Sequence, residues 1–196
     1  MVSELIRRRA IMVESGLPYD AKIEYLEFSG EQYCSTGYIG KPTMTFAIDF
    51  SYTVTTGFCV AGRGAAFRTE AKGYSGVTHY YFGASKTRNN APGRKTVTLS
   101  PTGVTIGTTF YAYDNGAIDP SMTTIDPILV GWNNTVQQAK LKGKVYGVTI
   151  YDNDSLVCNL IPVRVGQVGY MYDTISGELF GNLGTGSFIL GNDINT

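Results

Sequence analysis

Apolar and polar residues alternate through much of this chain with the two-residue period of a half-buried β-strand. The clearest example is the run Thr43–Tyr52, where every second residue is large and apolar. The members of that apolar face are Met44, Phe46, Ile48, Phe50 and Tyr52. We predict that this run is a strand with the apolar face turned into the core.

A second alternating stretch, Lys144–Val163, indicates a hairpin. Its centre, Asp152-Asn153-Asp154, has side chains that hydrogen-bond their own backbone and tolerate turn conformations. Strict alternation predicts one apolar face on each strand, formed by Tyr146, Val148 and Ile150 and by Leu156, Cys158 and Leu160. A slip of one residue would turn these faces to water, so we expect the hairpin to fix its own register and to nucleate an antiparallel core.

Shorter strand-like runs, separated by Gly, Asn, Asp and Pro, recur at the spacing of a β-sandwich. They are Lys22–Phe28, Gln32–Thr36, Phe58–Ala61, His79–Ala84, Lys95–Ser100, Val104–Tyr113, Ile128–Trp132, Gly169–Tyr172, Glu178–Phe180 and Ser187–Leu190. We predict loops for the basic segments before Val77 and over Ser85–Gly93, and a hairpin turn at Asp114-Asn115-Gly116. The pattern predicts one all-β domain over residues 21–196.

The first twenty residues differ from the rest. Ser3–Met12 is the one convincing helical stretch, with Ser3 as a cap, and Glu14–Ala21 reads as a linker containing Gly and Pro. Such a short helix is marginal alone, so we predict an arm over residues 1–20 that packs on another surface. Its predicted assembly residues are Leu5, Ile6, Arg7, Arg8, Arg9, Ile11 and Met12.

The net charge of the chain does not favour a particular class of binding partner. The chain of 196 residues has 16 basic and 16 acidic residues, which offers no general attraction to nucleic acid or to a membrane surface. Basic residues do gather between Gly62 and Lys95, where Glu70 is the one acidic residue. We interpret this cluster as a solvated surface in preference to a polyanion site.

The cysteines and the N-terminus suggest where the protein is made. Cys34, Cys59 and Cys158 are odd in number and widely spaced, so we expect free thiols formed in a reducing compartment. No apolar run approaches the length of a membrane span, and the arginines at positions 7–9 interrupt any secretory signal. We expect synthesis in a cytoplasm without export by a signal peptide.

Several segments resemble a known family. IEYLEFSGEQYCSTGY, from Ile23, resembles the opening "EYLESTGTQYIDTG" segment of concanavalin A-like (laminin-G-like) domains from gut Bacteroidetes, their phages and prophages. TFAIDFSY from Thr45 is similar to the strand that follows, and FYAYDNGAI from Phe110 to the "YVNG" strand and turn. KVYGVTIYDNDSLVCNLIPVRV and VGYMYDTISGELFGNLGTGSF resemble the C-terminal signature, and the arm is similar to leaders of phage-encoded members.

The resemblance implies a two-sheet antiparallel jelly-roll sandwich, with a short N-terminal helical arm in phage members. It does not settle function, because domains of this fold bind glycans, bind proteins or hydrolyse polysaccharides. Where the family usually has Ile-Asp after Gln-Tyr, this chain has Cys34-Ser35. Any ligand or cation contact made by that Asp in relatives is therefore absent here.

Catalysis finds little support in the sequence. Glycoside hydrolysis needs two carboxylates across a cleft, whereas Glu24 and Glu27 have opposite parity on a strand and Asp49 stands alone. His79 is the only histidine, and beside Tyr80 it fits a strand residue better than a base. We expect a non-enzymatic protein without a cofactor or metal. Calcium stays open, since Asp152–Asp154 and Asp114-Asn115 offer oxygens that turns also explain.

Aromatic residues are the best candidates for ligand contact. Tyr80, Tyr81 and Trp132, with Asn133, are of the types that stack on sugar rings and hydrogen-bond hydroxyls. Alternatively, any one of them belongs to the core, because adjacent strand residues point to opposite faces. Two hypotheses follow: a phage virion structural protein, anchored by its arm to other virion proteins or to copies of itself, and a carbohydrate-binding, lectin-like module.

Overall fold

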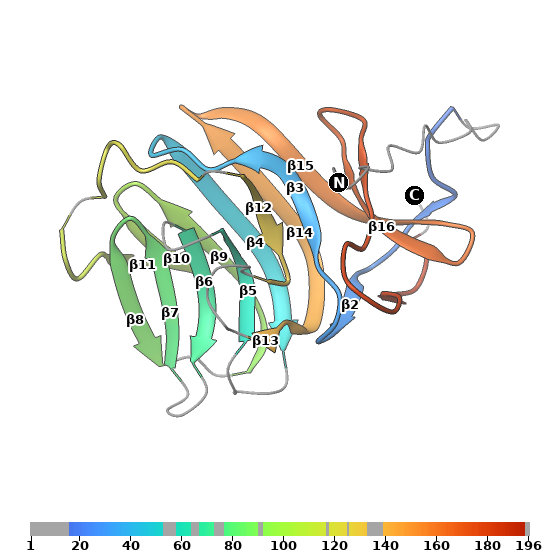
Figure 1. Cartoon of the computed structure of the whole chain (residues 1–196), viewed down its shortest axis with the longest axis horizontal. Helices are drawn as coiled ribbons and strands as arrows, with labels where there is room; N and C mark the ends of the chain where they lie inside the picture. Colours follow the sequence, from blue (N-terminus) through green and yellow to red (C-terminus); the bar gives the residue numbers. More distant parts are fainter. Residues whose placement is uncertain are drawn as a thin grey trace, which may run out of the picture.

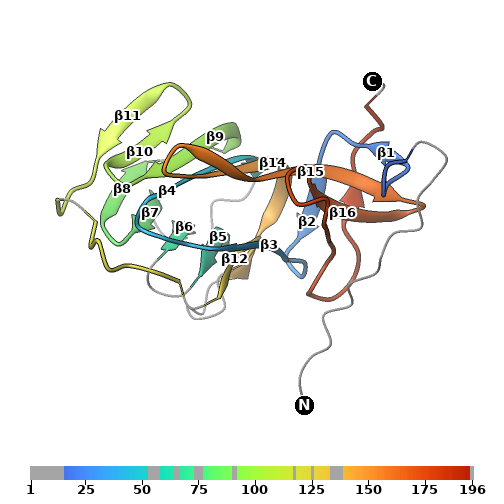
Figure 2. The same cartoon turned by 90° about the horizontal axis from the view of Figure 1, so that it is seen from above.

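Two β-sheets face each other across an apolar core in the computed structural model of the chain (Figures 1 and 2). The structure describes residues 16–52, 58–63, 67–72, 77–89, 92–116, 118–124, 126–132 and 139–194. Within these residues the strands pair antiparallel, except for one short parallel pair, and there is no helix. The predicted all-β sandwich is therefore confirmed.

The larger sheet has eleven strands in the described part of the chain. Its main path runs β11-β10-β9-β4-β14-β15-β16-β17, while β2 joins β14 and β18, and β1 joins β15. The bounds are β1 Ala21–Lys22, β2 Leu26–Ser29, β4 Met44–Tyr52, β9 Gly93–Ser100, β10 Gly103–Ile106, β11 Thr109–Ala112, β14 Lys142–Asp152, β15 Ser155–Val165, β16 Val168–Asp173, β17 Leu179–Phe180 and β18 Ile189–Leu190. In Figure 2 this sheet forms the upper layer over β5, β6 and β12.

The smaller sheet has seven described strands in the order β3-β12-β5-β6-β7-β8, with β13 parallel to β5. The bounds are β3 Cys34–Ile39, β5 Phe58–Arg63, β6 Phe67–Lys72, β7 Val77–Phe82, β8 Ser85–Asn89, β12 Pro127–Val130 and β13 Ala139–Lys140. The chain passes repeatedly from one sheet to the other, for example from β2 to β3 and from β13 to β14 (Figure 1).

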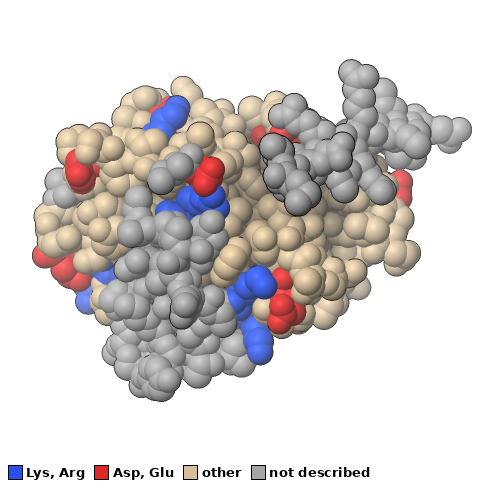
Figure 3. All heavy atoms as spheres, viewed as in Figure 1, with Lys and Arg blue, Asp and Glu red and all other residues tan. Residues whose placement is uncertain are grey.

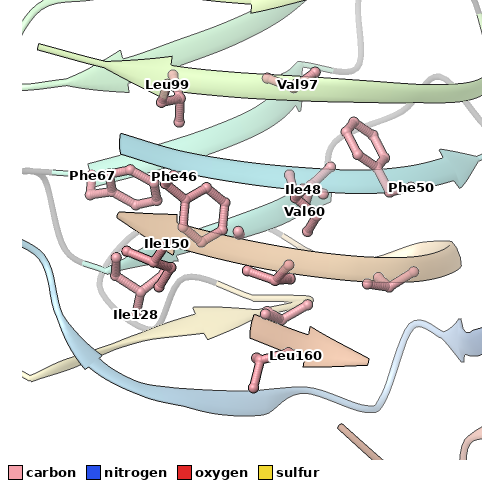
Figure 4. Packing of buried hydrophobic residues seen from close by; sticks show 14 of the residues in the cluster. Phe46, Ile48, Phe50, Val60, Phe67, Val97, Leu99, Ile128, Ile150 and Leu160 are labelled. Carbon is pink, nitrogen blue, oxygen red and sulfur yellow. The ribbon is translucent and has the colours of Figure 1, made fainter. Parts of the chain in front are cut away.

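The core follows the alternation of β4, which lies between β9 and β14. All five predicted apolar residues of this strand are buried. Figure 4 shows Phe46 beside Phe67 and Ile48 beside Val60, both partners belonging to the smaller sheet. The Phe46 and Phe67 rings meet edge to face with centroids 5.0 Å apart. Each such side chain contributes about 1.5–3 kcal/mol when it leaves water, so the five buried residues of β4 contribute strongly to stability.

Two β-bulges correct the strict alternation predicted for the central hairpin. Between β14 and β4 the register shifts between Val145 and Gly147, so Val145 takes the core position and Tyr146 turns outward. Between β14 and β15 it shifts again at Ile150/Tyr151, and Leu156 is 40% exposed. An extra residue on one strand reverses the faces beyond it, which periodicity alone does not reveal.

Two predicted loops, one predicted strand and one predicted hairpin turn also need correction. The basic segments contain β6 and β8, which pair on either side of β7. Val104–Tyr113 is two strands, because Gly107 adopts a positive φ of 60° at a turn. Asn115 joins no hairpin: its Oδ1 accepts a hydrogen bond from the Ser85 backbone N–H at 2.7 Å, and the next strand, β12, belongs to the other sheet.

Residues 1–15 of the predicted N-terminal arm lie outside the described residues, including the predicted helix Ser3–Met12 and the assembly residues. In the described end of the arm, Tyr19 packs edge-on against Tyr172 with ring centroids 5.0 Å apart, and the Asp20 backbone N–H donates to the Arg164 carbonyl at 2.9 Å. The described chain is thus fixed to β15 and β16 from the first residues that precede the sandwich.

The three cysteines are free and buried, as predicted. Cys34 lies in β3, Cys59 in β5 and Cys158 in β15. Burial raises the pKa of the Cys34 and Cys158 thiols to about 12, which keeps them protonated at neutral pH.

Among the residues that the structure describes, no helix is long and apolar enough to cross a membrane.

Candidate functional site

The outer face of the large sheet carries a row of charged and polar residues fixed by strand register. Lys144 of β14 lies opposite Glu27 of β2 on one side and Ser51 of β4 on the other, and Ser51 lies opposite Arg94 of β9. Their neighbours along the strands, such as Phe50, are buried, so this row faces away from the core. Four strands therefore present one continuous polar surface.

A shallow hollow of about 370 Å³ opens on this face. It is lined by Glu24, Tyr25, Arg94, Tyr146 and Ile194. The bulge in β14 is what makes Tyr146 part of the lining, because regular pairing would place this side chain in the core. We call this place the outer-face hollow.

Arg94 and Asp49 hold one wall of the outer-face hollow. The Arg94 guanidinium donates to both carboxylate oxygens of Asp49, from Nε at 3.1 Å and from Nη2 at 2.8 Å. Its central carbon lies 3.8 Å from the centroid of the Tyr146 ring, a cation–π distance. The hydrogen bonds to Asp49 raise the pKa of Arg94 further, so this side chain stays charged.

Tyr25 and Lys144 form the adjoining wall. The Tyr25 ring meets the Tyr146 ring edge to face, with centroids 5.7 Å apart and an interplanar angle of 69°. Lys144 Nζ lies 3.9 Å from the Tyr25 centroid and 4.0 Å from Glu27 Oε2. Interaction with the Tyr25 side chain raises the pKa of Lys144, so its ammonium group is also charged at neutral pH.

The C-terminal segment completes the rim. Asn192 donates from Nδ2 to Glu24 Oε2 at 3.1 Å, and the Glu24 backbone N–H donates to the Asn192 carbonyl at 2.9 Å. The Ile194 side chain, 47% exposed, adds an apolar edge. The hollow thus combines two half-buried rings, an apolar rim and side chains that donate and accept hydrogen bonds, which suits a small polar ligand with an apolar face.

The residues predicted as ligand contacts are not brought together. Tyr80 is fully buried in the core, which corrects its assignment as a contact, since no ligand can reach it. Tyr81 is half-buried on β7, and Trp132 follows β12, three strand positions away in the smaller sheet. Asn133 lies outside the described residues.

Trp132 belongs to a separate aromatic group on the smaller sheet. Its ring is 4.8 Å from that of Tyr33, centroid to centroid, with the planes inclined at 54°. Lys140 Nζ lies 5.5 Å from the Trp132 centroid and 3.6 Å from Glu31 Oε2. Trp132 and Lys140 therefore lie on the smaller sheet, apart from the residues that line the outer-face hollow.

The acidic turns considered for calcium have other partners. Asp152 accepts hydrogen bonds from Lys41 Nζ at 2.7 Å, Tyr38 Oη at 2.8 Å and Thr43 Oγ1 at 2.5 Å. Lys41 foremost lowers the pKa of this carboxyl to about 2. Asp114 pairs with Lys86. Among the described residues there is no cluster of three or more His, Cys, Asp or Glu side chains placed to hold a metal ion.

The sequence missed the outer-face hollow for two reasons. Tyr146 was assigned to the core by alternation, and Tyr25 and Arg94 become neighbours only through the pairing of β2, β14, β4 and β9. The available signal was local: Gly147 follows Tyr146, and glycine inside a strand often accompanies a bulge.

The fold defines the chain as an all-β protein built of two packed antiparallel sheets. No protein-family model matches the chain, and none of the curated proteins matches its sequence. Among solved structures, the chain is similar to the crystal structure of a "putative carbohydrate binding protein" from Bacteroides ovatus ATCC 8483. The TM-score is 0.54 at 10% sequence identity, over 90% of this chain.

The likeness spans 61% of the Bacteroides ovatus chain, so this chain corresponds to about three fifths of that protein. At 10% identity it is a likeness of fold. It supports the two-sheet architecture, while the ligand has to be argued from the outer-face hollow itself.

Proposed function

We propose that this chain is a carbohydrate-binding module whose ligand docks in the outer-face hollow. The observation that carries the proposal is the pair of half-buried rings of Tyr25 and Tyr146, set among hydrogen-bonding groups in one hollow. A sugar ring has an apolar face of C–H groups and an edge of hydroxyls, so it can contact both parts of such a lining. The fold shared with the Bacteroides ovatus protein agrees with this function.

The proposal covers binding without hydrolysis. Each carboxylate around the outer-face hollow already has a partner: Glu24 accepts from Asn192, Glu27 faces Lys144, and Asp49 is held by Arg94. These partners leave no obvious pair of carboxyl groups free to act as general acid and base. We therefore expect the ligand to leave unchanged.

A glycan array with the full chain, followed by titration calorimetry, tests the proposal. Tyr146→Ala should weaken binding about tenfold, the effect of losing about 1.4 kcal/mol of ring contact. Trp132→Ala is the matched control, because it removes a half-buried ring from the other sheet. Unchanged binding in Tyr146→Ala together with loss in Trp132→Ala would move the site to the smaller sheet, and a blank array would refute carbohydrate binding.

We also propose the finer assignments that the sequence resemblance implies. The sandwich would be a concanavalin A-like jelly roll; in support, β4 lies between β9 and β14, which are distant in sequence. The protein would be a virion component of a phage of gut bacteria, made in the host cytoplasm and held to virion proteins or to its own copies by its arm. A virion lectin would combine this role with glycan binding.

A further inference from the structure

The charges around the outer-face hollow narrow the kind of sugar that it can take. Resting on the proposed carbohydrate binding, we propose that this site selects uncharged glycans and disfavours acidic ones such as uronate polymers. The reason is that both of its cations are neutralised from within the protein, while an additional carboxylate remains on the rim.

Arg94 is the group that would otherwise attract an acidic sugar. Two of its nitrogens already donate to both oxygens of Asp49, and one face of its guanidinium lies on the Tyr146 ring. A ligand carboxylate would have to compete with Asp49 for this fork, and it would meet the Asp49 charge directly behind it. A hydroxyl group carries no such penalty, because it needs only a remaining N–H.

Lys144 also has partners within the protein that would compete with an acidic sugar. Its ammonium lies over the Tyr25 ring and 4.0 Å from the Glu27 carboxylate. Glu24, which also lines the hollow, is exposed, and among the described residues its carboxylate accepts a hydrogen bond from the uncharged Asn192 amide. The two cations and the three carboxylates of Asp49, Glu24 and Glu27 give a local charge of −1.

Glu24 and Arg94 line the hollow, Asp49 bonds Arg94, and Lys144, next to Glu27, lies over the lining residue Tyr25. Charges this close together interact within the Debye length of about 8 Å at physiological ionic strength. An acidic glycan therefore meets a repulsive site, whereas the hydroxyls of a neutral glycan can donate to Glu24 and accept from Arg94. Of the basic residues between Gly62 and Lys95 whose side chains are described, three pair with a carboxylate: Arg63 with Asp126, Lys86 with Asp114 and Arg94 with Asp49. The other two, Arg88 and Lys95, lie over the rings of Tyr111 and Tyr52.

The face of the molecule in Figure 3 shows the same balance. Among its described residues, basic side chains lie next to acidic ones, and neither sign forms a broad patch. Long-range attraction of a polyanion therefore has no evident source on this face, in line with the net charge of zero.

The test uses the full chain and matched glycans. Each acidic polysaccharide of a panel is paired with its carboxyl-reduced form, which keeps the backbone and replaces each uronate by a neutral sugar. We expect binding to neutral and reduced members, at least about tenfold tighter than to the acidic partners. Raising the ionic strength from about 0.01 to 0.15 M, which shortens the Debye length from about 30 to 8 Å, should change the affinity for neutral members less than twofold.

Two variants make the charge argument specific. Asp49→Asn removes the carboxylate that occupies the Arg94 guanidinium and brings the local charge to zero. This variant should bind the acidic polysaccharides at least about threefold more tightly. Glu24→Gln makes the same change of charge while leaving the Arg94–Asp49 pair intact. It tests the same effect of charge on binding if Asp49→Asn fails to fold.

The outcomes separate the two proposals. Preference of the unmodified chain for acidic over reduced partners overturns the selectivity and leaves carbohydrate binding standing. Failure of both variants to improve binding of acidic members overturns the charge explanation. Absence of binding to any member overturns carbohydrate binding and the selectivity together.

Discussion

At the scale of residues, the outer face of the large sheet is organised by ion pairs that also hold aromatic rings. Arg94 bonds Asp49 and covers Tyr146, and Lys144 approaches both Glu27 and Tyr25. Solvent-accessible pairs of this kind contribute only about 0–1 kcal/mol to stability. Their main effect is therefore to orient the rings, so ligand affinity can be lost by substitution there while the fold persists.

Asp152 makes a residue-scale prediction about pH. Its hydrogen bonds to Lys41, Thr43 and Tyr38 lower its pKa from 3.8 to about 2. A carboxyl with a depressed pKa in the folded state stabilises the protein above its unfolded pKa, and this stabilisation is lost as the pH falls toward the folded value. We expect part of the stability to disappear between about pH 4 and pH 2.

Urea unfolding at several pH values, on the unmodified chain and on Asp152→Asn, measures this contribution. The variant should be less stable at pH 7, and the difference should shrink as the pH falls from 4 to 2. Asp154→Asn is the control, since Asp154 is the next acidic residue of the same turn and its side chain accepts no hydrogen bond from the described residues. A difference that stays constant over this range would contradict the assignment.

At the scale of elements, the sequence predicts strands well where alternation is uninterrupted. β4 agrees with its pattern residue by residue. The sequence did not predict β6 and β8 because most of their residues are polar or charged, and their strand conformation comes from pairing with β7. The bulge at Tyr146 was missed because hydrophobic periodicity reports only the average face, whereas a bulge is decided by how two strands fit.

The role of β4 gives an element-scale prediction. Ile48 is fully buried and lies between Val97 of β9 and Val148 of β14, so Ile48→Ala leaves a cavity that the sheet cannot close. We expect a loss of about 2–5 kcal/mol in the free energy of unfolding. Thr98→Ala, on the outer face of the neighbouring β9, should change it by about 0.5 kcal/mol or less. Similar losses in both variants would mean that β4 is not the centre of the core.

At the scale of the whole molecule, composition and turn spacing were enough to predict one all-β domain. They could not assign strands to sheets, because an apolar pattern tells which side of a strand is buried but not which strand lies beside it. The outer-face hollow depends on that missing information, since its lining comes from residues 24–25, 94, 146 and 194. Only the folded sheet brings these residues together.

The predicted assembly role of the N-terminal arm concerns the whole molecule and can be tested by deletion. The described domain is anchored from Tyr19 onward, by contacts with Tyr172 and Arg164 that need no earlier residue. Deleting residues 1–16 should therefore leave the melting temperature nearly unchanged while abolishing self-association or incorporation into a particle. Size-exclusion chromatography with light scattering and calorimetry measure both effects. Normal assembly of the truncated chain, or its unfolding, would refute the assembly role of the arm.

The pairing of residues 22–27 with the C-terminal residues 189–194 has a mechanical consequence. Ile23 bridges Asp193, Ile194 donates to the Lys22 carbonyl at 2.9 Å, and β18 pairs with β2. A force that pulls residue 194 away from the sandwich would load these few bonds first and separate the C-terminal segment from Lys22 and Ile23. Glu24 and Ile194 line the outer-face hollow, so the same force would open the hollow. A ligand bound there would contact both segments and hold them together. The strength of glycan binding would then depend on the direction of the applied force.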